Sequence, residues 1–209
     1  MRLLVAGASG RTGRIFTTLA LKNGHEVTAF VRESSRFDMR HERLRVVRGD
    51  VLVADDLTPA FADQDATLSL LAPRPRRDGR VWVEGTRNLA DAAGAAGVRR
   101  LLVVSAEGAG VEPSSLPPAY RLVLRIPVVS RLYPDLAQME RDLETRGDLD
   151  WTIVRAAILT NGPRTGAYRT VVGKVVHRGL SISRADLAEF LLTVVETGAF
   201  VGQHVAIAR

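Results

Sequence analysis

The 209-residue sequence contains no cysteine and no long apolar run. Without cysteine, the chain has no disulfide, no thiolate metal ligand and no cysteine nucleophile. No apolar run approaches the ~18 residues that a membrane-spanning helix needs. The apolar stretch after Arg2 ends at Gly7, which is too early for a secretory signal. We therefore expect a cytoplasmic protein with no membrane contact.

Aromatic residues are also scarce, at 5% of the chain, whereas positive charge is in excess. The chain has 29 Lys and Arg against 23 Asp and Glu, a formal net charge of +6. Such an excess can serve nucleic acid, a membrane surface or an anionic small molecule. The few aromatic residues leave little for stacking on bases, which argues against a nucleic-acid partner.

The four histidines, at positions 25, 41, 177 and 204, are scattered along the chain. No two of them have the i, i+4 spacing of a helical metal site, and none lies in a cluster of carboxylates. We therefore predict no metal.

Short apolar runs alternate with segments of helical periodicity, which predicts strands and helices in alternation. The expected strands are Leu3–Ala6, Val27–Val31, Leu44–Val47, Ala66–Leu71, Leu101–Ser105, Trp151–Arg155, Thr170–Val176 and His204–Ala208. The expected helices are Ile15–Asn23, Asp55–Ala62, Val83–Ala96, Asp135–Arg146 and Ser183–Glu196. This order is typical of an α/β, doubly wound parallel sheet of the Rossmann type, and the length suits a single domain over residues 1–209.

One segment departs from the alternation. Glu112–Pro134 holds five of the nine prolines, together with the apolar and basic stretch Tyr120–Leu132. We expect a small irregular insertion there, on the substrate side, over the carboxyl ends of the strands, where such sheets bind ligands. Its apolar side chains would roof a substrate pocket or form a subunit contact.

The first strand is followed by Gly7-Ala8-Ser9-Gly10-Arg11-Thr12-Gly13, with glycine at every third position. One glycine allows the tight turn, one lets the backbone approach a pyrophosphate, and one lets the helix pack against the strand. The helix N-terminus then offers free N–H groups to the phosphates. A strand before these glycines and a helix after them favour dinucleotide binding. The alternative is a plain glycine-rich turn without a ligand.

The end of the second strand indicates which dinucleotide is bound. NAD enzymes usually carry an acidic residue there for the ribose 2′-hydroxyl, whereas this chain has Arg32, with Ser35 and Arg36 close behind. Arginine pairs well with a 2′-phosphate, so we predict NADP(H). Adjacent Glu33 should project to the side opposite Arg32. The alternative is that Arg32 and Arg36 are solvated surface charges.

Asp50-Val51 follows the third strand. The Asp50 carboxylate is placed to accept from the adenine amino group, although an aspartate after a glycine also forms turns on its own.

Two further segments allow a functional and a structural interpretation. The basic segment Arg74–Arg80 would attract an anionic acceptor at the mouth of the site, or is a solvated loop. Ser183 and Asp186 form a predicted capping box at the start of the last helix. Asp135 and Glu140 lie five residues apart, so they do not share a helix face and predict no carboxylate pair.

Several longer segments resemble a known family. LVAGASGRTG, EVTAFVRESSRF, VVRGDV, LDWTIVRAAILTNGPRTGAY and SISRADLAEFLL are similar to atypical short-chain dehydrogenases/reductases. The most similar group is the biliverdin-IXβ reductase/flavin reductase type, with the NmrA-like proteins nearby. The resemblance covers nearly the whole chain. It implies a Rossmann fold that holds extended NADPH and delivers hydride to a flavin or another planar, conjugated acceptor.

The resemblance also implies roles for particular residues. Leu71-Ala72-Pro73 would border the nicotinamide ribose, and Ala156-Ala157-Ile158 would flank the nicotinamide amide. Ser105 would lie beside the nicotinamide and the acceptor, and it is our candidate catalytic residue. Its alternative is a strand-end serine that satisfies a backbone group.

Two departures from the family bear on the chemistry. The usual Tyr with Lys four residues later is absent, because Tyr120 is followed by Leu124 and Tyr133 by Ala137. The Pro-Pro-His of biliverdin-IXβ reductases is replaced by Ala156-Ala157-Ile158, which argues against biliverdin as substrate. Hydride transfer to a flavin or quinone needs little acid catalysis, so it remains compatible with both departures.

We therefore predict an NADPH-dependent reductase with a small-molecule partner and no nucleic acid or membrane partner, as a monomer or homodimer. Two alternatives stay open: an epimerase or ketoreductase of a biosynthetic pathway, and a non-catalytic NmrA-like redox sensor.

Overall fold

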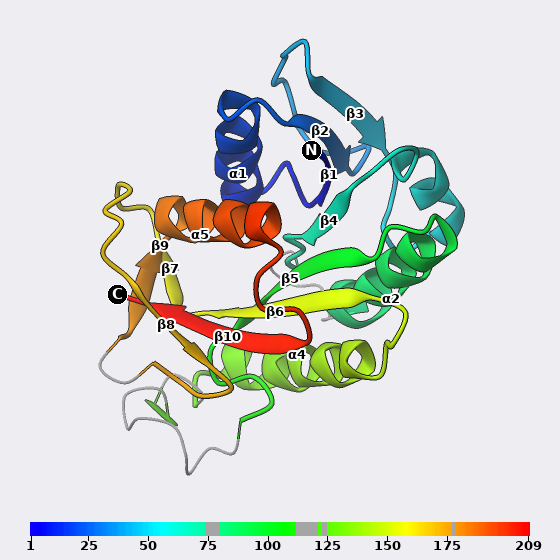
Figure 1. Cartoon of the computed structure of the whole chain (residues 1–209). Helices are drawn as coiled ribbons and strands as arrows, with labels where there is room; N and C mark the ends of the chain where they lie inside the picture. Colours follow the sequence, from blue (N-terminus) through cyan, green and yellow to red (C-terminus); the bar gives the residue numbers. More distant parts are fainter. Residues whose placement is uncertain (74–79, 112–120, 123–124, 177–178) are drawn as a thin grey trace.

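A computed structural model describes residues 1–73, 80–111, 121–122, 125–176 and 179–209 (Figure 1). An eight-stranded sheet forms its centre, in the order β3-β2-β1-β4-β5-β6-β10-β8. The strands are β1 (Arg2–Ala6), β2 (Glu26–Val31), β3 (Leu44–Arg48), β4 (Ala66–Ser69), β5 (Arg100–Ala106), β6 (Asp150–Ala156), β8 (Arg169–Val172) and β10 (Gln203–Ala208). All pairings are parallel except that of β8 with β10.

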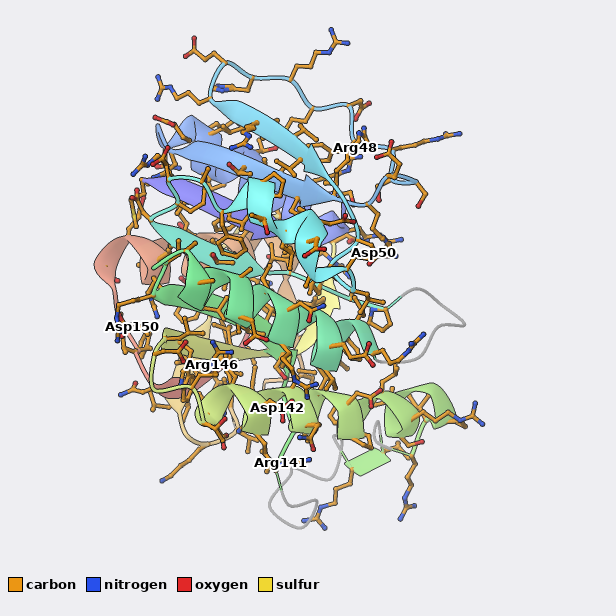
Figure 2. All side chains as sticks on the ribbon, turned by 90° about the vertical axis from the view of Figure 1, so that its right-hand side faces the viewer. Arg48, Asp50, Arg141, Asp142, Arg146 and Asp150 are labelled. Carbon is orange, nitrogen blue, oxygen red and sulfur yellow. The ribbon has the colours of Figure 1, made fainter. Side chains whose placement is uncertain are left out.

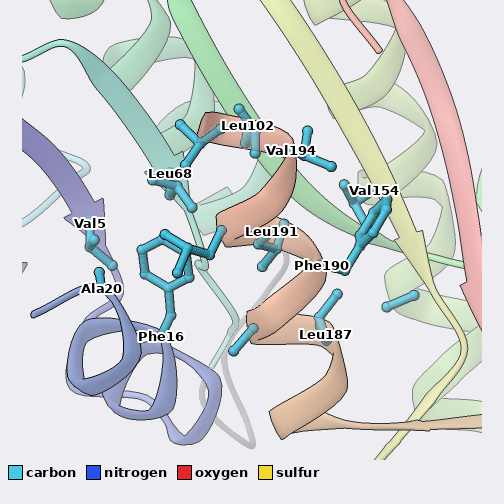
Figure 3. Packing of buried hydrophobic residues seen from close by; sticks show 14 of the residues in the cluster. Val5, Phe16, Ala20, Leu68, Leu102, Val154, Leu187, Phe190, Leu191 and Val194 are labelled. Atoms are coloured by element: carbon cyan, nitrogen blue, oxygen red, sulfur yellow. The ribbon is translucent and has the colours of Figure 1, made fainter. Parts of the chain in front are cut away.

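Helices cover both faces of the sheet. On one face lie α1 (Arg11–Lys22) and α5 (Arg184–Thr197), and on the other α2 (Arg80–Ala95) and α4 (Pro127–Glu144). The 3-10 helix η1 (Ala54–Ala60) packs beside α2. Figure 3 shows Phe16 of α1 and Leu191 of α5 against Leu68 of the sheet. The predicted doubly wound, single-domain Rossmann fold is confirmed.

Burial on both faces explains the all-apolar strands. Leu3 and Val5 of β1 face the core under α1 and α5, whereas Leu4 and Ala6 face the core under α2. All four side chains are fully buried. The strand order reverses between β1 and β4, and in such sheets a ligand crevice opens at the carboxyl ends of the strands at that reversal.

The last third of the chain differs from the expectation. β8 runs antiparallel to β10 and ends at Val172, four residues before the expected end of its strand. A second sheet pairs β7 (Ile158–Thr160) with β9 (Ser181–Ser183), and neither strand was predicted. Three residues are too few for a periodic signal, and hydropathy carries no information on strand direction.

The expected insertion Glu112–Pro134 is partly wrong. Residues 127–134 are not irregular but form the first turns of α4, which begins eight residues before the predicted helix. Pro127 stands at the first helical positions, where its missing N–H costs nothing. Pro134 lies inside the helix instead of ending it. Most of the remaining insertion, residues 112–120 and 123–124, lies outside the described residues, as does most of the basic segment, residues 74–79.

The start of α5 confirms half of the predicted capping box. The Ser183 hydroxyl accepts from the Asp186 N–H at 2.9 Å, as an N-cap does. The Asp186 carboxylate does not bind the Ser183 backbone. It accepts from the Ser183 hydroxyl at 2.8 Å and from the N–H groups of Thr165 and Gly166 at 2.6 and 2.9 Å. The side chain therefore fastens the loop after β7 to the helix.

No helix in the described part of the chain is long and apolar enough to cross a membrane. Within the same part of the chain, no three His, Asp or Glu side chains lie together as a metal site would require.

Candidate functional site

The glycine-rich turn joins β1 to α1. Gly7 has a φ of +84°, which favours glycine, and the Gly10 N–H closes the turn on the Gly7 carbonyl at 2.9 Å. Gly10 is the N-cap of α1 and has no capping side chain, and the first turn of α1 carries no acidic residue. The N-terminus of α1 therefore keeps free N–H groups and its partial positive charge, as an anion site requires.

At two of these positions, Gly7 and Gly13, there is no space for a Cβ atom. A Cβ on Gly7 would come within 2.5 Å of the Leu70 carbonyl oxygen of the neighbouring strand. A Cβ on Gly13 would collide with the Gly7 carbonyl and with the backbone of Ala8. Gly13 thus lets α1 pack directly on the turn. These contacts agree with the roles expected for the tight turn and for the helix packing.

A cavity of about 370 Å³ lies at this turn, at the carboxyl ends of β1, β2 and β4. Of the residues predicted to bind the cofactor, Gly7, Ser9, Gly10, Arg32, Ser35, Arg36, Asp50, Val51, Leu71, Ala72 and Pro73 line it. The structure thus brings together residues from four separate segments of the chain.

The sequence analysis missed five further lining residues, namely Phe30, Val31, Leu52, Leu70 and Val81. Most are neighbours of predicted residues. Ser34 and Arg80 also line the cavity. Ser34 stands beside the predicted Ser35, and Arg80 ends the basic segment that the sequence analysis placed at the mouth of the site.

One end of the cavity is rich in cations and hydroxyls. Arg32, Ser34, Ser35 and Arg36 all line it and belong to a turn that the Ser35 N–H closes on the Arg32 carbonyl at 2.9 Å. Glu33 is exposed and is not among the lining residues, as the alternation of side chains predicted. The part of the lining that follows β2 therefore carries guanidinium groups and no carboxylate, whereas a ribose 2′-hydroxyl would favour an acidic residue there.

Asp50 makes the predicted turn interaction and also lines the cavity. Its Oδ1 accepts from the Leu52 N–H at 3.1 Å, which is the local turn interaction. Its own N–H donates to Asp56 Oδ2 at 2.8 Å, and the residue still lines the cavity. The geometry therefore leaves the adenine contact available but makes the turn sufficient to explain an aspartate at this position.

Of the residues expected around the nicotinamide, Ser105, Ala156, Ala157 and Ile158 lie farther along the sheet and do not line the cavity, unlike Leu71, Ala72 and Pro73. Ser105, near the end of β5, is 5% exposed, and its hydroxyl has no hydrogen-bond partner among the described residues. Ala156 and Ala157 are buried at the end of β6, and Ile158 is half exposed at the start of β7. Arg11 and Thr12 belong to the first turn of α1 and are likewise outside the cavity lining.

Tyr133 is the described tyrosine nearest to this end of β5. Its hydroxyl donates to the Glu107 carbonyl at 2.9 Å, and Glu107 follows β5 by one residue. Burial, with a contribution from the Glu107 carboxylate, raises the pKa of Tyr133 to about 12. A hydroxyl with that pKa and an occupied hydrogen bond is a poor proton donor near neutral pH. Tyr120 lies outside the described residues.

The cavity suits the cofactor that the sequence predicts. A free helix N-terminus faces the turn, the glycine backbone leaves room where any Cβ would intrude, and arginines line the far end. A dinucleotide with an extra phosphate needs the same three features. Ser105 adds a buried hydroxyl that no described residue satisfies.

Comparison with known proteins assigns the family. A family model described as NAD(P)H-binding matches residues 7–197. The chain belongs to this NAD(P)H-binding family. The match begins at Gly7, the first residue of the glycine-rich turn. It confirms the family resemblance found in the sequence, as membership of an NAD(P)H-binding family.

The chain is also similar to individual proteins. An uncharacterized chloroplast protein of Arabidopsis thaliana is 31% identical over 202 residues, covering 90% of this chain and 69% of that protein. A 3-diazoavenalumate denitrifying reductase of a Streptomyces species is 37% identical over 117 residues, covering 50% of this chain and 38% of that protein. Among solved structures, a short-chain dehydrogenase/reductase of Veillonella parvula in complex with NADP has a TM-score of 0.83 at 17% identity, covering all of this chain and 94% of that one.

Proposed function

We propose that this member of the NAD(P)H-binding family is an NADPH-dependent reductase that passes hydride to a flavin, a quinone or another planar conjugated molecule. The observation that carries the cofactor assignment is the lining of the cavity beyond β2. Arg32 and Arg36 lie there with Ser34 and Ser35, and the adjacent Glu33 is not part of the lining. Charge-assisted hydrogen bonds to a 2′-phosphate suit this set of groups.

The relatives support the reaction class. The Streptomyces relative that matches half of this chain is named a reductase, and the solved neighbour from Veillonella parvula holds NADP. The acceptor itself rests on the family resemblance and on the chemistry of the site.

Positioning accounts for catalysis in this proposal. Bound NADPH would supply the hydride. The turn at Gly7–Gly10 and the N-terminus of α1 hold the pyrophosphate, and Leu71, Ala72 and Pro73 border the ribose next to the nicotinamide. The Ser105 hydroxyl, which has no described partner, orients the nicotinamide or donates to the acceptor. Because a flavin or quinone takes its proton from solvent, the missing Tyr-Lys pair and the occupied Tyr133 hydroxyl do not impede this reaction.

The cofactor assignment predicts a selective loss on removing the arginines. Arg32→Ala and Arg36→Ala should each raise the KM for NADPH about 10- to 100-fold, since a hydrogen bond to a charged group contributes roughly 1.5–3 kcal/mol. The KM for NADH should change little. Arg40→Ala is the matched control, because Arg40 is exposed in the same segment and does not line the cavity. Steady-state kinetics with both cofactors measure the effect, and an equal loss for NADPH and NADH would contradict the assignment.

The same assay separates the alternatives. Oxidation of NADPH with a panel of flavins and quinones, followed at the nicotinamide absorbance band, is expected for the reductase. Tight NADP⁺ binding without turnover across the panel would favour the non-catalytic sensor instead. Oxidation of NADPH by a ketone, with none on the panel, would favour the ketoreductase. An epimerase restores its cofactor in each cycle, so it would show as inversion of a substrate stereocentre without net NADPH oxidation.

A further inference from the structure

The segment that follows β2, residues 32–38, is called here the β2 loop. Its inner side supplies Arg32, Ser34, Ser35 and Arg36 to the cavity. Its backbone carbonyls at positions 33, 35 and 36 accept hydrogen bonds from two other arginines, Arg48 and Arg14. Neither of these two arginines is among the residues that line the cavity.

Arg48 reaches the β2 loop from the end of β3, beside Val31 at the end of β2. Its Nη1 lies 3.3 Å from the Glu33 carbonyl oxygen and 3.4 Å from that of Ser35. Figure 2 shows Arg48 at the edge of the sheet, where β3 leads toward Asp50. The Arg48 guanidinium thus binds two backbone carbonyls of the turn that contains Ser34 and Ser35.

Arg14 reaches the same loop from α1. Its Nη2 donates to the Arg36 carbonyl, and its Nε donates to the Ser9 carbonyl of the phosphate turn at 3.3 Å. The guanidinium also lies 5.1 Å from the ring centre of Phe37, which is buried in the core, and Nη1 pairs with Asp38 at 3.2 Å. Arg14 therefore joins the two parts of the cavity that would hold the pyrophosphate and the 2′-phosphate.

These contacts affect anion binding because the backbone groups of a loop act on an anion in opposite ways. N–H groups attract a phosphate and carbonyl oxygens repel it. When guanidinium groups outside the cavity hold the carbonyls, the loop is fixed with its cationic side chains and hydroxyls toward the cavity. The guanidinium charges also add to the positive potential there. The phosphate then meets a preformed site, so less of its binding energy goes into ordering the loop.

We propose that Arg14 and Arg48 are positioning residues that hold the β2 loop in the form that selects the 2′-phosphate. They set cofactor preference without touching the cofactor. This inference rests on the proposed NADPH specificity. The experiment below therefore distinguishes a wrong cofactor assignment from a wrong role of Arg14 and Arg48.

The test compares the dissociation constants of NADP⁺ and NAD⁺ by calorimetry for the full-length protein and its variants. Arg14→Gln and Arg48→Gln should each lower the preference for NADP⁺ about 5- to 30-fold, mainly through weaker NADP⁺ binding. Arg45→Gln is the control for Arg48, because Arg45 also lies on β3 but donates to the Pro59 carbonyl, away from the loop. Lys22→Gln, at the other end of α1, is the control for Arg14.

Arg14→Lys separates positioning from charge. A lysine keeps the positive charge but has one nitrogen in place of the guanidinium fork, so it cannot hold Ser9 and Arg36 together. Positioning predicts that Arg14→Lys stays impaired, and full recovery of NADP⁺ preference in Arg14→Lys would overturn the proposal. Thermal melts of every variant check that the fold is kept.

The outcomes distinguish the two proposals. A wild-type protein that binds NAD⁺ as well as NADP⁺ would overturn the proposed function. A wild type that prefers NADP⁺, with the preference unchanged in Arg14→Gln and Arg48→Gln, would overturn the inference and leave the proposed function standing. Equal weakening of NADP⁺ and NAD⁺ in these two variants would also overturn it, since the arginines would then support only the general fold of the site.

Discussion

At the scale of single residues, Ser105 is the group whose environment most needs explanation. It is buried near the carboxyl end of β5, and its hydroxyl finds no partner among the described residues. An unsatisfied buried hydroxyl costs roughly 1–3 kcal/mol. Other buried hydroxyls in the described part of the chain share this state, among them that of Thr67 in the middle of β4. Ser105 differs by its place at the end of a strand, where such sheets bind ligands.

Ser105→Ala should therefore lower kcat/KM with NADPH about 5- to 10-fold, the value of one lost hydrogen bond of about 1 kcal/mol. Stability should stay equal or rise, because the substitution removes a buried polar group without a partner. Thr67→Val is the control, and it should leave activity unchanged while it acts on stability in the same way. Kinetics and thermal melts measure the two effects. Unchanged kcat/KM in Ser105→Ala would make Ser105 a packing residue.

At the scale of elements, a buried ion pair joins α4 to β6. Glu140 Oε2 lies 2.6 Å from Arg155 Nη2, with the two side chains 2% and 10% exposed. Figure 2 shows α4 running along this side of the sheet. Burial and then the Arg155 charge lower the pKa of neighbouring His204. The Glu140 carboxylate accepts from both Nε and Nη2 of Arg155 and so balances its buried charge. The sequence analysis weighed Glu140 only against Asp135 and had no means to find Arg155 as its partner.

Glu140→Gln should lower the free energy of unfolding by about 3 kcal/mol, because removing one member leaves a buried charge without compensation. Glu144→Gln is the control: Glu144 is 44% exposed and its Oε1 lies 3.0 Å from His204 Nε2 at the surface, so its loss should cost no more than about 1 kcal/mol. Urea denaturation measures both. The double variant Glu140→Leu with Arg155→Met should recover most of the loss, and a single variant as stable as the wild type would show that the pair contributes nothing.

At the scale of the whole molecule, much of the positive charge is matched across the surface. Exposed pairs such as Arg99 with Asp150 and Arg87 with Asp142 tie neighbouring elements together. Arg32 and Arg36 after β2 and Arg80 at the start of α2 line the same cavity. Under the proposed function, the positive charge of these side chains helps to capture a polyanionic cofactor.

Cofactor binding should consequently stabilise the whole fold. NADP⁺ at about a hundred times its dissociation constant adds roughly 2.7 kcal/mol, which corresponds to about 5–10 °C in Tm for a domain of this size. NAD⁺ at the same concentration should raise Tm by about 1–2 °C if it binds about a hundred times more weakly. Differential scanning fluorimetry measures both shifts, and equal shifts would contradict a site selective for the 2′-phosphate.

The strands and the phosphate turn were predictable because their signals are local. A strand buried on both faces needs an unbroken apolar run, as in Leu3–Ala6, and a turn without room for a Cβ needs glycine, as at Gly7 and Gly13. The start of α4 was not predictable. Its prolines look like breaks in the sequence, yet Pro127 sits where the first turn needs no N–H and Pro134 is accommodated inside a long helix.

The sequence by itself determined the buried parallel strands, the position of the glycine-rich turn and the arginines after β2, because each depends on residues within one segment. Only the tertiary structure decided which residues share a cavity, how Arg14 and Arg48 hold the β2 loop, and that Asp186 fastens the loop after β7. These contacts join side chains to backbone carbonyls and N–H groups many residues away. Every residue carries such backbone groups, so the sequence holds no signal for which of them a side chain will reach.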